Sequence, residues 1–202
     1  MPLRVAVAVS GGGTNLQALL DALPPGAPAQ VVLVVSNKPA AGGLERARQR
    51  GVPAVAFADP ADGNEWLELL RRHQADLVVL AGYLKLVPAA VVTAYRGRII
   101  NIHPALLPDF GGPGMYGARV HQAVLASGVR ESGPTVHLVD EEYDRGTILA
   151  QVRVPVLPGD TPATLAERVL AQEHRLLPLV VLAAARAGHP VPLGPDLEPQ
   201  GS

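Results

Sequence analysis

Apolar residues in the first half of the chain occur in short uninterrupted runs, separated by amphipathic segments. The runs predict strands at 5–9, 31–35, 54–57, 77–81 and 99–102. The segments between them have apolar residues at helical spacing and predict helices at 15–23, 44–50, 65–73 and 88–95. Strands without polar alternation are covered on both faces, so we expect a mostly parallel sheet with helices on each side.

The pattern changes in the second half. A helix is predicted at 118–126, followed by apolar runs at 135–139 and 148–154. The acidic connector between these runs, 140–146, is too short for a crossover helix, so the runs should pair as an antiparallel hairpin. A last helix is predicted from Thr161 toward Arg186, with Pro162 suited to its first turn.

The predicted fold class is therefore α/β. We expect a Rossmann-like doubly wound, mostly parallel sheet with a C-terminal antiparallel hairpin and a long final helix. Residues 1–187 are expected to form a single domain. Residues 188–202 are rich in Pro and Gly and are expected to form a C-terminal tail.

Composition narrows the function classes. A length of 202 residues with 48% hydrophobic residues supports one substantial core. Cysteine is absent, which excludes disulfides, a thiolate nucleophile and cysteine-ligated metal. The 17 basic and 18 acidic residues provide no strongly basic surface for nucleic acid, and no apolar run has membrane-spanning length. We expect a cytoplasmic protein.

Asn101 and His103 are the first candidates for chemistry. They end a β-branched run, and Pro104 biases the residue before it toward an extended backbone. Residues two apart on a strand share a face, so an amide and an imidazole lie side by side at the carboxyl end of the strand, where ligands bind in parallel sheets. Taken alone, such a pair more often serves capping and packing.

The second candidate is the turn 10–15, with the sequence Ser-Gly-Gly-Gly-Thr-Asn between the first strand and the first helix. Glycines let backbone N–H groups approach an anion at a helix N-terminus. The turn lacks the Lys of a P-loop and the third Gly of a dinucleotide fingerprint, so phosphate monoester binding fits better. A plain strand-to-helix turn capped by Thr14 is the alternative.

The other titratable residues are open to simpler explanations. His121 and His137, each taken alone, are interpreted as structural histidines, and no spacing of the His-Glu-x-x-His type predicts a metal site. The four carboxylates of the connector are typical of a solvated loop. An Asp brought close to His103 would, however, favour the imidazolium and assist proton transfer.

A family resemblance supports the functional interpretation. The sequence Asn-Ile-His-Pro-Ala-Leu-Leu-Pro at 101–108 resembles the Asn-x-His-Pro-Ser-Leu-Leu-Pro motif of the folate-dependent formyltransferases, with Ala105 where Ser is usual. Residues 10–16 resemble the substrate-phosphate loop of that family. The whole chain is most similar to the branch that formylates glycinamide ribonucleotide in purine synthesis. The resemblance implies direct transfer of the formyl group of 10-formyltetrahydrofolate to that amine, through a tetrahedral intermediate and without a metal ion.

The resemblance also implies residue roles. The implied catalytic residues are Asn101, His103 and Asp144. The residues implied to bind glycinamide ribonucleotide are Gly12, Gly13, Thr14, Asn15 and Glu173. Those implied to bind the folate are Leu84, Lys85, Val87, Val139, Asp140, Glu141 and Asp144. Many relatives have a basic residue in the segment corresponding to 58–64, which has none here.

Two other functions are compatible with parts of the sequence. The first is another 10-formyltetrahydrofolate-dependent formyltransferase or hydrolase of the same family. The second is a non-catalytic nucleotide-binding module, which would explain the glycine-rich turn but not Asn101, His103 and Asp144 together. The expected partners are the two small molecules, with no nucleic acid and no membrane, for a monomer or homodimer.

Overall fold

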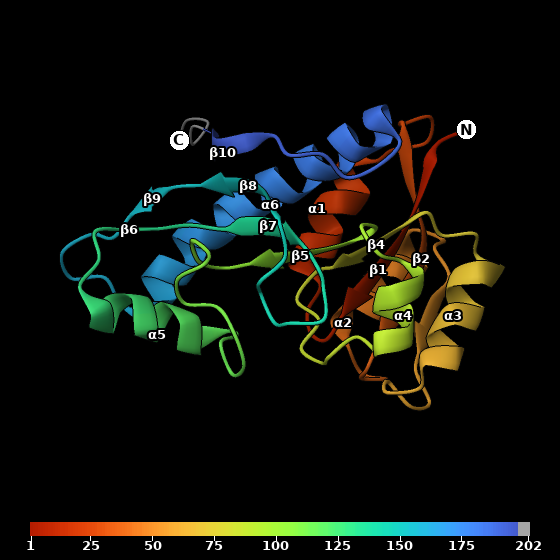
Figure 1. Ribbon diagram of the computed structural model, residues 1–202, viewed down its shortest axis with the longest axis horizontal. Coiled ribbons are helices and arrows are strands. Elements are labelled where there is room, and N and C mark those ends of the chain that lie inside the picture. Colours follow the sequence, from red (N-terminus) through yellow and green to blue (C-terminus); the bar gives the residue numbers. More distant parts are fainter. Residues whose placement is uncertain (198–202) are drawn as a thin grey trace.

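The computed structural model describes residues 1–197, and Figure 1 shows their arrangement. The helices are α1 (Thr14–Ala22), α2 (Gly42–Gln49), α3 (Gly63–Arg72), α4 (Ala89–Ala94), α5 (Ala118–Ser127) and α6 (Pro162–Ala187). The strands of the first half are β1 (Leu3–Val9), β2 (Ala29–Ser36), β3 (Ala54–Ala56), β4 (Leu77–Leu80) and β5 (Ile99–His103). Those of the second half are β6 (Glu131–Ser132), β7 (Thr135–Leu138), β8 (Ile148–Val152), β9 (Val154–Pro155) and β10 (Gly194–Leu197).

One sheet of eight strands organises the described part of the chain, in the order β10-β8-β7-β5-β4-β1-β2-β3. The strands from β3 to β5 are parallel, and β7 pairs antiparallel with both β5 and β8. Strand β5 is therefore the boundary between the two kinds of pairing. The predicted fold class, a mostly parallel doubly wound sheet with a later antiparallel hairpin, is confirmed.

Helices cover both faces of this sheet, as expected for strands without polar alternation. Helices α1, α2 and α6 pack on one face around a core that includes Leu16, Leu44 and Leu177. Helices α3 and α4 pack on the other face around Trp66 and Val91. In Figure 1, α3 and α4 lie together beside the first half of the sheet, and α6 runs along the other side.

Helix α6 is long because its start is well defined and its apolar face is continuous. Thr161 caps it: its hydroxyl accepts from the Thr164 backbone N–H at 3.2 Å, and its own N–H donates to the Thr164 hydroxyl at 2.9 Å. Pro162 follows in the first turn, where a missing N–H costs nothing. The first half of α6 packs against α5 through a third core that includes Val124, Leu165 and Val169.

Three short strands were not predicted. Strands β6 and β9, each of two residues, form a separate small sheet, and β10 pairs parallel with β8 at the edge of the main sheet. Two-residue strands have no periodicity that a sequence can reveal. The expected tail 188–202 contains β10, while its last residues, 198–202, lie outside the described part of the chain; the division into a domain and a tail stays a prediction.

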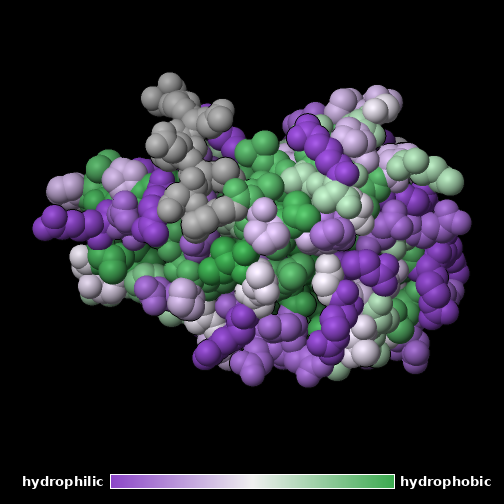
Figure 2. Space-filling view, turned by 45° about the horizontal axis from the view of Figure 1, so that its top comes forward, coloured by the Kyte–Doolittle hydropathy of each residue, from purple (hydrophilic) through white to green (hydrophobic). Residues whose placement is uncertain are grey.

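The surface in the space-filling view is divided between polar and apolar areas. Figure 2 shows hydrophobic residues gathered over the middle of the visible face, with hydrophilic residues concentrated toward its two ends. Among residues 1–197, no helix combines the length and the apolar character that crossing a membrane requires.

Candidate active site

The pairing of β5 with β7 places four polar side chains in register. Asn101 lies opposite His137, and His103 lies opposite Thr135. Directly opposed residues of an antiparallel pair project to the same face. His103 and His137 are 3% and 1% exposed, so both imidazoles are held inside the protein at the end of β5.

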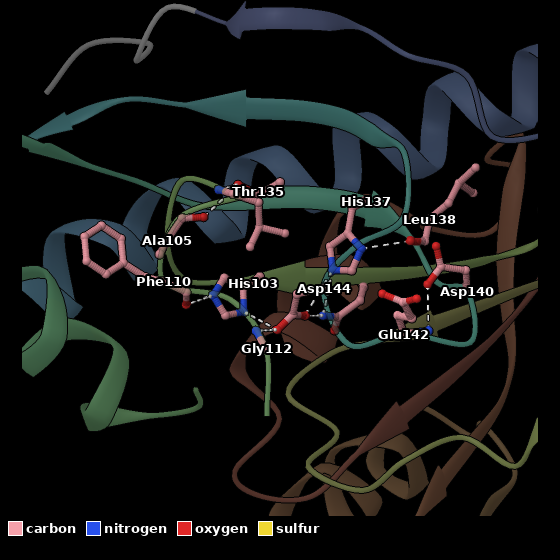
Figure 3. Close-up of polar contacts among 12 residues, drawn as sticks. His103, Ala105, Phe110, Gly112, Thr135, His137, Leu138, Asp140, Glu142 and Asp144 are labelled. Atoms are coloured by element: carbon pink, nitrogen blue, oxygen red, sulfur yellow. Dashed lines mark hydrogen bonds and ion pairs between the residues drawn. The ribbon is translucent and has the colours of Figure 1, made fainter. Parts of the chain in front are cut away.

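The connector between β7 and β8 adds a carboxylate to this group. Asp144 Oδ2 lies 3.6 Å from His103 Nδ1, and Asp144 Oδ1 lies 3.4 Å from His137 Nε2 and 3.5 Å from Asn101 Nδ2. Figure 3 shows the carboxylate between the two imidazoles. The structure thus brings together Asn101, His103 and Asp144, the three side chains that the resemblance singled out, in one place.

A glycine makes this approach possible. A Cβ atom at Gly111 would lie 2.6 Å from Leu107 Cδ2, closer than real Cβ atoms come, and 3.0 Å from Asp144 Cβ, which is a tight contact. The next residue, Gly112, donates its backbone N–H to Asp144 Oδ2 at 2.9 Å. The loop after β5 therefore both makes room for the carboxylate and holds it.

Backbone carbonyls fix the protons of both imidazoles. His103 Nε2 lies 2.8 Å from the Phe110 carbonyl and His137 Nδ1 lies 2.8 Å from the Leu138 carbonyl; since a carbonyl only accepts, each of these nitrogens carries a proton. In the neutral form, Nε2 of His137 then accepts from Asn101 Nδ2, 3.1 Å away. Likewise, Nδ1 of neutral His103 is an unprotonated nitrogen facing Asp144.

The protonation states follow from burial and from these contacts. Burial lowers the pKa of His103, and the neighbouring Asp144 carboxylate opposes this only in part. Burial acts to raise the pKa of Asp144, but the hydrogen bonds with His137 and the Gly112 N–H, and the charge of His103 when it is protonated, outweigh burial and lower that pKa. The cluster at neutral pH therefore holds a neutral imidazole beside an ionised carboxylate.

The cluster opens into a cavity of about 800 Å³, which also reaches Asn15, His121 and Glu173. Six of the seven residues expected to bind folate line this cavity: Leu84, Lys85, Val87, Val139, Asp140 and Asp144. The remaining one, Glu141, instead contacts Arg96 at 3.3 Å and lines an adjoining cavity of about 720 Å³. The volume of the first cavity suits a drug-sized organic ligand.

Two residues of the expected amine site meet in this cavity. Asn15 Nδ2 donates to Glu173 Oε2 at 2.6 Å, and the oxygen Oδ1 of the buried Asn15 side chain has no partner within residues 1–197. Burial raises the pKa of Glu173, and the hydrogen bond from Asn15 offsets part of that rise. A buried acceptor without a partner is a position where a ligand donor would be stabilised.

The glycine-rich turn presents its N–H groups outward. The carbonyls of Gly11, Gly12 and Gly13 accept from Gly43 N at 3.0 Å, Arg46 Nε at 2.7 Å and Gln17 N at 2.9 Å. In a planar trans peptide the N–H points away from the carbonyl. The N–H groups of Gly12, Gly13 and Thr14 therefore face away from these donors, at the N-terminus of α1, in an arrangement that suits an anion.

A serine links this turn to the apolar turn after β4. The Ser10 hydroxyl donates to Asn37 Oδ1 at 2.6 Å and accepts from the backbone N–H of Leu84 at 2.8 Å. Ser10 is 3% exposed, so its single hydroxyl has both roles filled inside the protein. The glycine-rich turn and the part of the cavity wall at Leu84 are thereby linked through one side chain.

Comparison with known proteins assigns the family. The family model described as formyl transferase matches residues 3–181. The chain belongs to the formyl transferase family. The match covers both the glycine-rich turn and the cluster around Asp144, so the residues discussed above all lie within the family domain.

Curated relatives are similar over most of the chain. The phosphoribosylglycinamide formyltransferase, chloroplastic, of Arabidopsis thaliana is 51% identical over 88% of this chain and 64% of its own length. That of Vigna unguiculata is 48% identical over 89% of this chain and 60% of its own length. This formyl transferase chain therefore spans less than two thirds of both plant proteins. The phosphoribosylglycinamide formyltransferase of Haemophilus influenzae is 39% identical over 88% of this chain and 85% of its own.

Solved structures agree with this family fold. A phosphoribosylglycinamide formyltransferase from Brucella melitensis has a TM-score of 0.83 at 45% identity, covering 92% of this chain and 96% of its own. A glycinamide ribonucleotide transformylase from Symbiobacterium toebii has a TM-score of 0.86 at 42% identity. The match covers 92% of this chain and 89% of that protein.

The expectation of a cytoplasmic protein is wrong as judged by these relatives. Both plant formyltransferases, at 51% and 48% identity, are chloroplastic proteins. The physical reason is that an absence of cysteine and of long apolar runs is compatible with more than one compartment, so these features did not support the choice.

His137 was not predicted to belong to the cluster around Asp144 in this formyl transferase. Its imidazole contacts both Asn101 and Asp144, although it was interpreted as a structural histidine. The signal was available: once the run 135–139 is taken as a strand beside β5, His137 shares the face of Asn101. Among residues 1–197, no group of three or more His, Asp or Glu side chains is arranged to hold a metal ion, and a metal-free reaction stays a prediction.

Proposed function

We propose that this formyl transferase moves the formyl group of 10-formyltetrahydrofolate to the amine of glycinamide ribonucleotide, a step of purine biosynthesis. The observation that carries the proposal is the convergence of Asn101, His103 and Asp144 at one end of the 800 Å³ cavity. Relatives that share 39–51% identity bear the name of this activity, which adds support.

Two binding regions follow from the arrangement. The folate would occupy the cavity against Leu84, Lys85 and Val87 and beneath the connector with Val139, Asp140 and Glu141. The phosphate of glycinamide ribonucleotide would bind the outward N–H groups of Gly12, Gly13, Thr14 and Asn15. Its amine would meet the carboxylate of Glu173, which lines the same cavity as Asp144.

The reaction is a direct transfer between the two bound substrates. The amine nitrogen attacks the formyl carbon, a C–N bond forms, and the carbonyl oxygen becomes an oxyanion. The Asn101 amide donates to that oxygen. His103 keeps its Nε2–H on the Phe110 carbonyl, which holds the ring in one orientation for the proton transfer.

Proton transfer completes the cycle. The attacking nitrogen loses one proton and the departing folate nitrogen gains one when its bond to the formyl carbon breaks. His103 Nδ1 is unprotonated beside Asp144, 3.6 Å away, so it can accept the proton as an imidazolium that the carboxylate stabilises. It then returns the proton to the leaving nitrogen. No nucleophilic side chain takes part, in keeping with a chain that has no cysteine.

One assay tests the proposal. Purified protein with both substrates is expected to form deacylated folate, followed by absorbance, at a rate that depends on glycinamide ribonucleotide. Deacylated folate appearing equally fast without the amine would indicate hydrolysis. Absence of saturable binding of a folate analogue would instead favour a nucleotide-binding module. Sedimentation of the same sample would decide between the expected monomer and homodimer.

A further inference from the structure

The carbonyl side of the glycine-rich turn is held by a cation from another helix. Arg46, on α2, donates from Nε to the Gly12 carbonyl at 2.7 Å and from Nη1 to the Gln17 side-chain oxygen at 3.2 Å. Gln17 in turn donates to Asp21 Oδ1 at 2.9 Å. The guanidinium is thus attached at two points, one on the turn and one on α1.

Close backbone packing explains why Arg46 reaches the turn. A Cβ at Gly13 would lie 2.6 Å from Gly43 Cα, and a Cβ at Gly43 would lie 2.8 Å from Val9 Cγ2. The start of α2 therefore rests directly on the turn, which Gly13 enters with φ 72°. Arg46 follows Gly43 by three residues, so it lies on the same side of the helix, above the turn.

The positive charge of Arg46 matters because the segment in which many relatives carry a basic residue has none here. The segment 58–64 contains Asp59 and Asp62 and no Lys or Arg. Among the described residues that line the 800 Å³ cavity, the single Lys or Arg is Lys85, which belongs to the turn after β4. Arg46 is a cation in direct contact with the turn, so it can add to the peptide dipoles that a phosphate dianion would meet there.

We propose that Arg46 is a positioning residue for the substrate phosphate. It holds the Gly12–Gly13 peptide with its N–H outward and places a permanent positive charge behind that peptide. This inference rests on the proposed function, because it takes the ligand of the turn to be the phosphate monoester of the amine substrate.

The physical effect has two parts. A charged donor on the Gly12 carbonyl polarises the peptide, so the Gly13 N–H on its opposite side becomes a stronger donor. The guanidinium also stays protonated throughout the working pH range, so the strength of its attraction for a dianion does not change through loss of its own charge. Both parts act on binding of the phosphate-bearing substrate and leave the transfer of the formyl group untouched.

The test compares Arg46→Gln with wild type. R46Q is expected to raise KM for glycinamide ribonucleotide about tenfold, as for the loss of a hydrogen bond to a charged group. KM for the folate and kcat are expected to stay at wild-type values, a split that a general loss of structure would not produce. R46K, which keeps the charge with one attachment, should fall between wild type and R46Q.

A matched control lies on the same helix. Arg48 is exposed and contacts Glu45 at 3.7 Å, away from the turn, so R48Q removes one positive charge without touching the turn. R48Q is expected to keep wild-type KM for both substrates. An equal rise of KM in R48Q and R46Q would reduce the effect to net charge and overturn the positioning role.

A binding measurement separates this inference from the proposed function. Calorimetric titration with ribose 5-phosphate needs no formyl transfer, so it tests Arg46 even if the transfer assay fails. Weaker binding to R46Q than to R48Q supports the inference, and equal binding overturns it. If R46Q does not fold, Q17L, which removes the second attachment of the guanidinium, must weaken the same binding; unchanged binding by Q17L overturns the inference.

Discussion

The amide of Asn15 donates to the carboxylate of Glu173 at 2.6 Å, across 158 positions of sequence. Asn15 lies in the first turn of α1, and Glu173 lies near the middle of α6. Both residues line the 800 Å³ cavity, and their contact joins two side chains that the resemblance assigned to one substrate. The buried carboxylate of this pair carries the first prediction.

Glu173→Gln separates binding from stability. The neutral amide cannot attract the substrate amine, so KM for glycinamide ribonucleotide should rise about tenfold. Burial raises the pKa of Glu173, so the folded state holds its proton more tightly than the unfolded chain does. The free energy of unfolding of the wild type should therefore fall as pH rises from 4.5, the ordinary pKa of a Glu side chain, through the raised pKa of Glu173. E173Q has no group that titrates at this position, so it should not show this fall. Thermal melting against pH checks it; parallel curves for the two proteins would contradict it.

Asp144→Asn should damage turnover far more than binding. The variant keeps the size of the side chain but cannot stabilise an imidazolium at His103, so kcat should fall by about 10²–10⁴-fold. Asp144 also has a lowered pKa, so its ionised form stabilises the wild type above the ordinary value of 3.8, and this contribution is lost as pH falls. Steady-state kinetics is the measurement, with E142Q, an exposed carboxylate of the same connector, as the control. If kcat of D144N were as high as that of E142Q, Asp144 would have no part in the mechanism.

The pH profile should report His103. Its neutral form accepts the proton, so kcat should fall as pH decreases through the pKa of that imidazole. Burial lowers this pKa, which places the midpoint of the acidic limb below the ordinary value of 6.5. Because Asp144 acts to raise the same pKa, the residual activity of D144N should have its midpoint at still lower pH. If the midpoint of the acidic limb moved to higher pH in D144N, the titrating group would not be His103.

Gly111→Ala should displace the catalytic carboxylate without removing any polar group. The added methyl would meet Leu107 Cδ2 and Asp144 Cβ at 2.6 and 3.0 Å, so the Leu107 side chain must move and Asp144 must give way slightly. Overpacking of this kind costs roughly 1–3 kcal/mol, and kcat should fall about tenfold through the misplaced Asp144. Denaturant unfolding and kinetics give the two values. The double variant L107A/G111A relieves the nearer contact, so recovery of stability without recovery of kcat would confirm that the effect on rate passes through Asp144.

The sequence predicted the elements that have a clear period and missed features that depend on tertiary contact. The runs at 5–9 and 99–102 became β1 and β5 because fully buried strands carry a continuous apolar signal. Asn101 and His103 were recognised as candidate site residues because two polar side chains stand at the end of a continuous apolar run. The contact of Arg46 with Gly12 was not foreseen, since an Arg on an exposed helix face has many possible partners. Short strands such as β6 were missed because pairing, rather than local composition, creates them.

The position of β5 has a consequence for how the protein can move. This strand pairs with β4 as far as Asn101 and with β7 as far as His103, so both residues are held by a neighbouring strand. Phe110 and Asp144, by contrast, come from connectors and both adopt positive φ angles, 56° and 54°. We therefore expect any rearrangement on ligand binding in the two connectors and not in the strand, so a spectroscopic probe in either connector should respond more than one on β5.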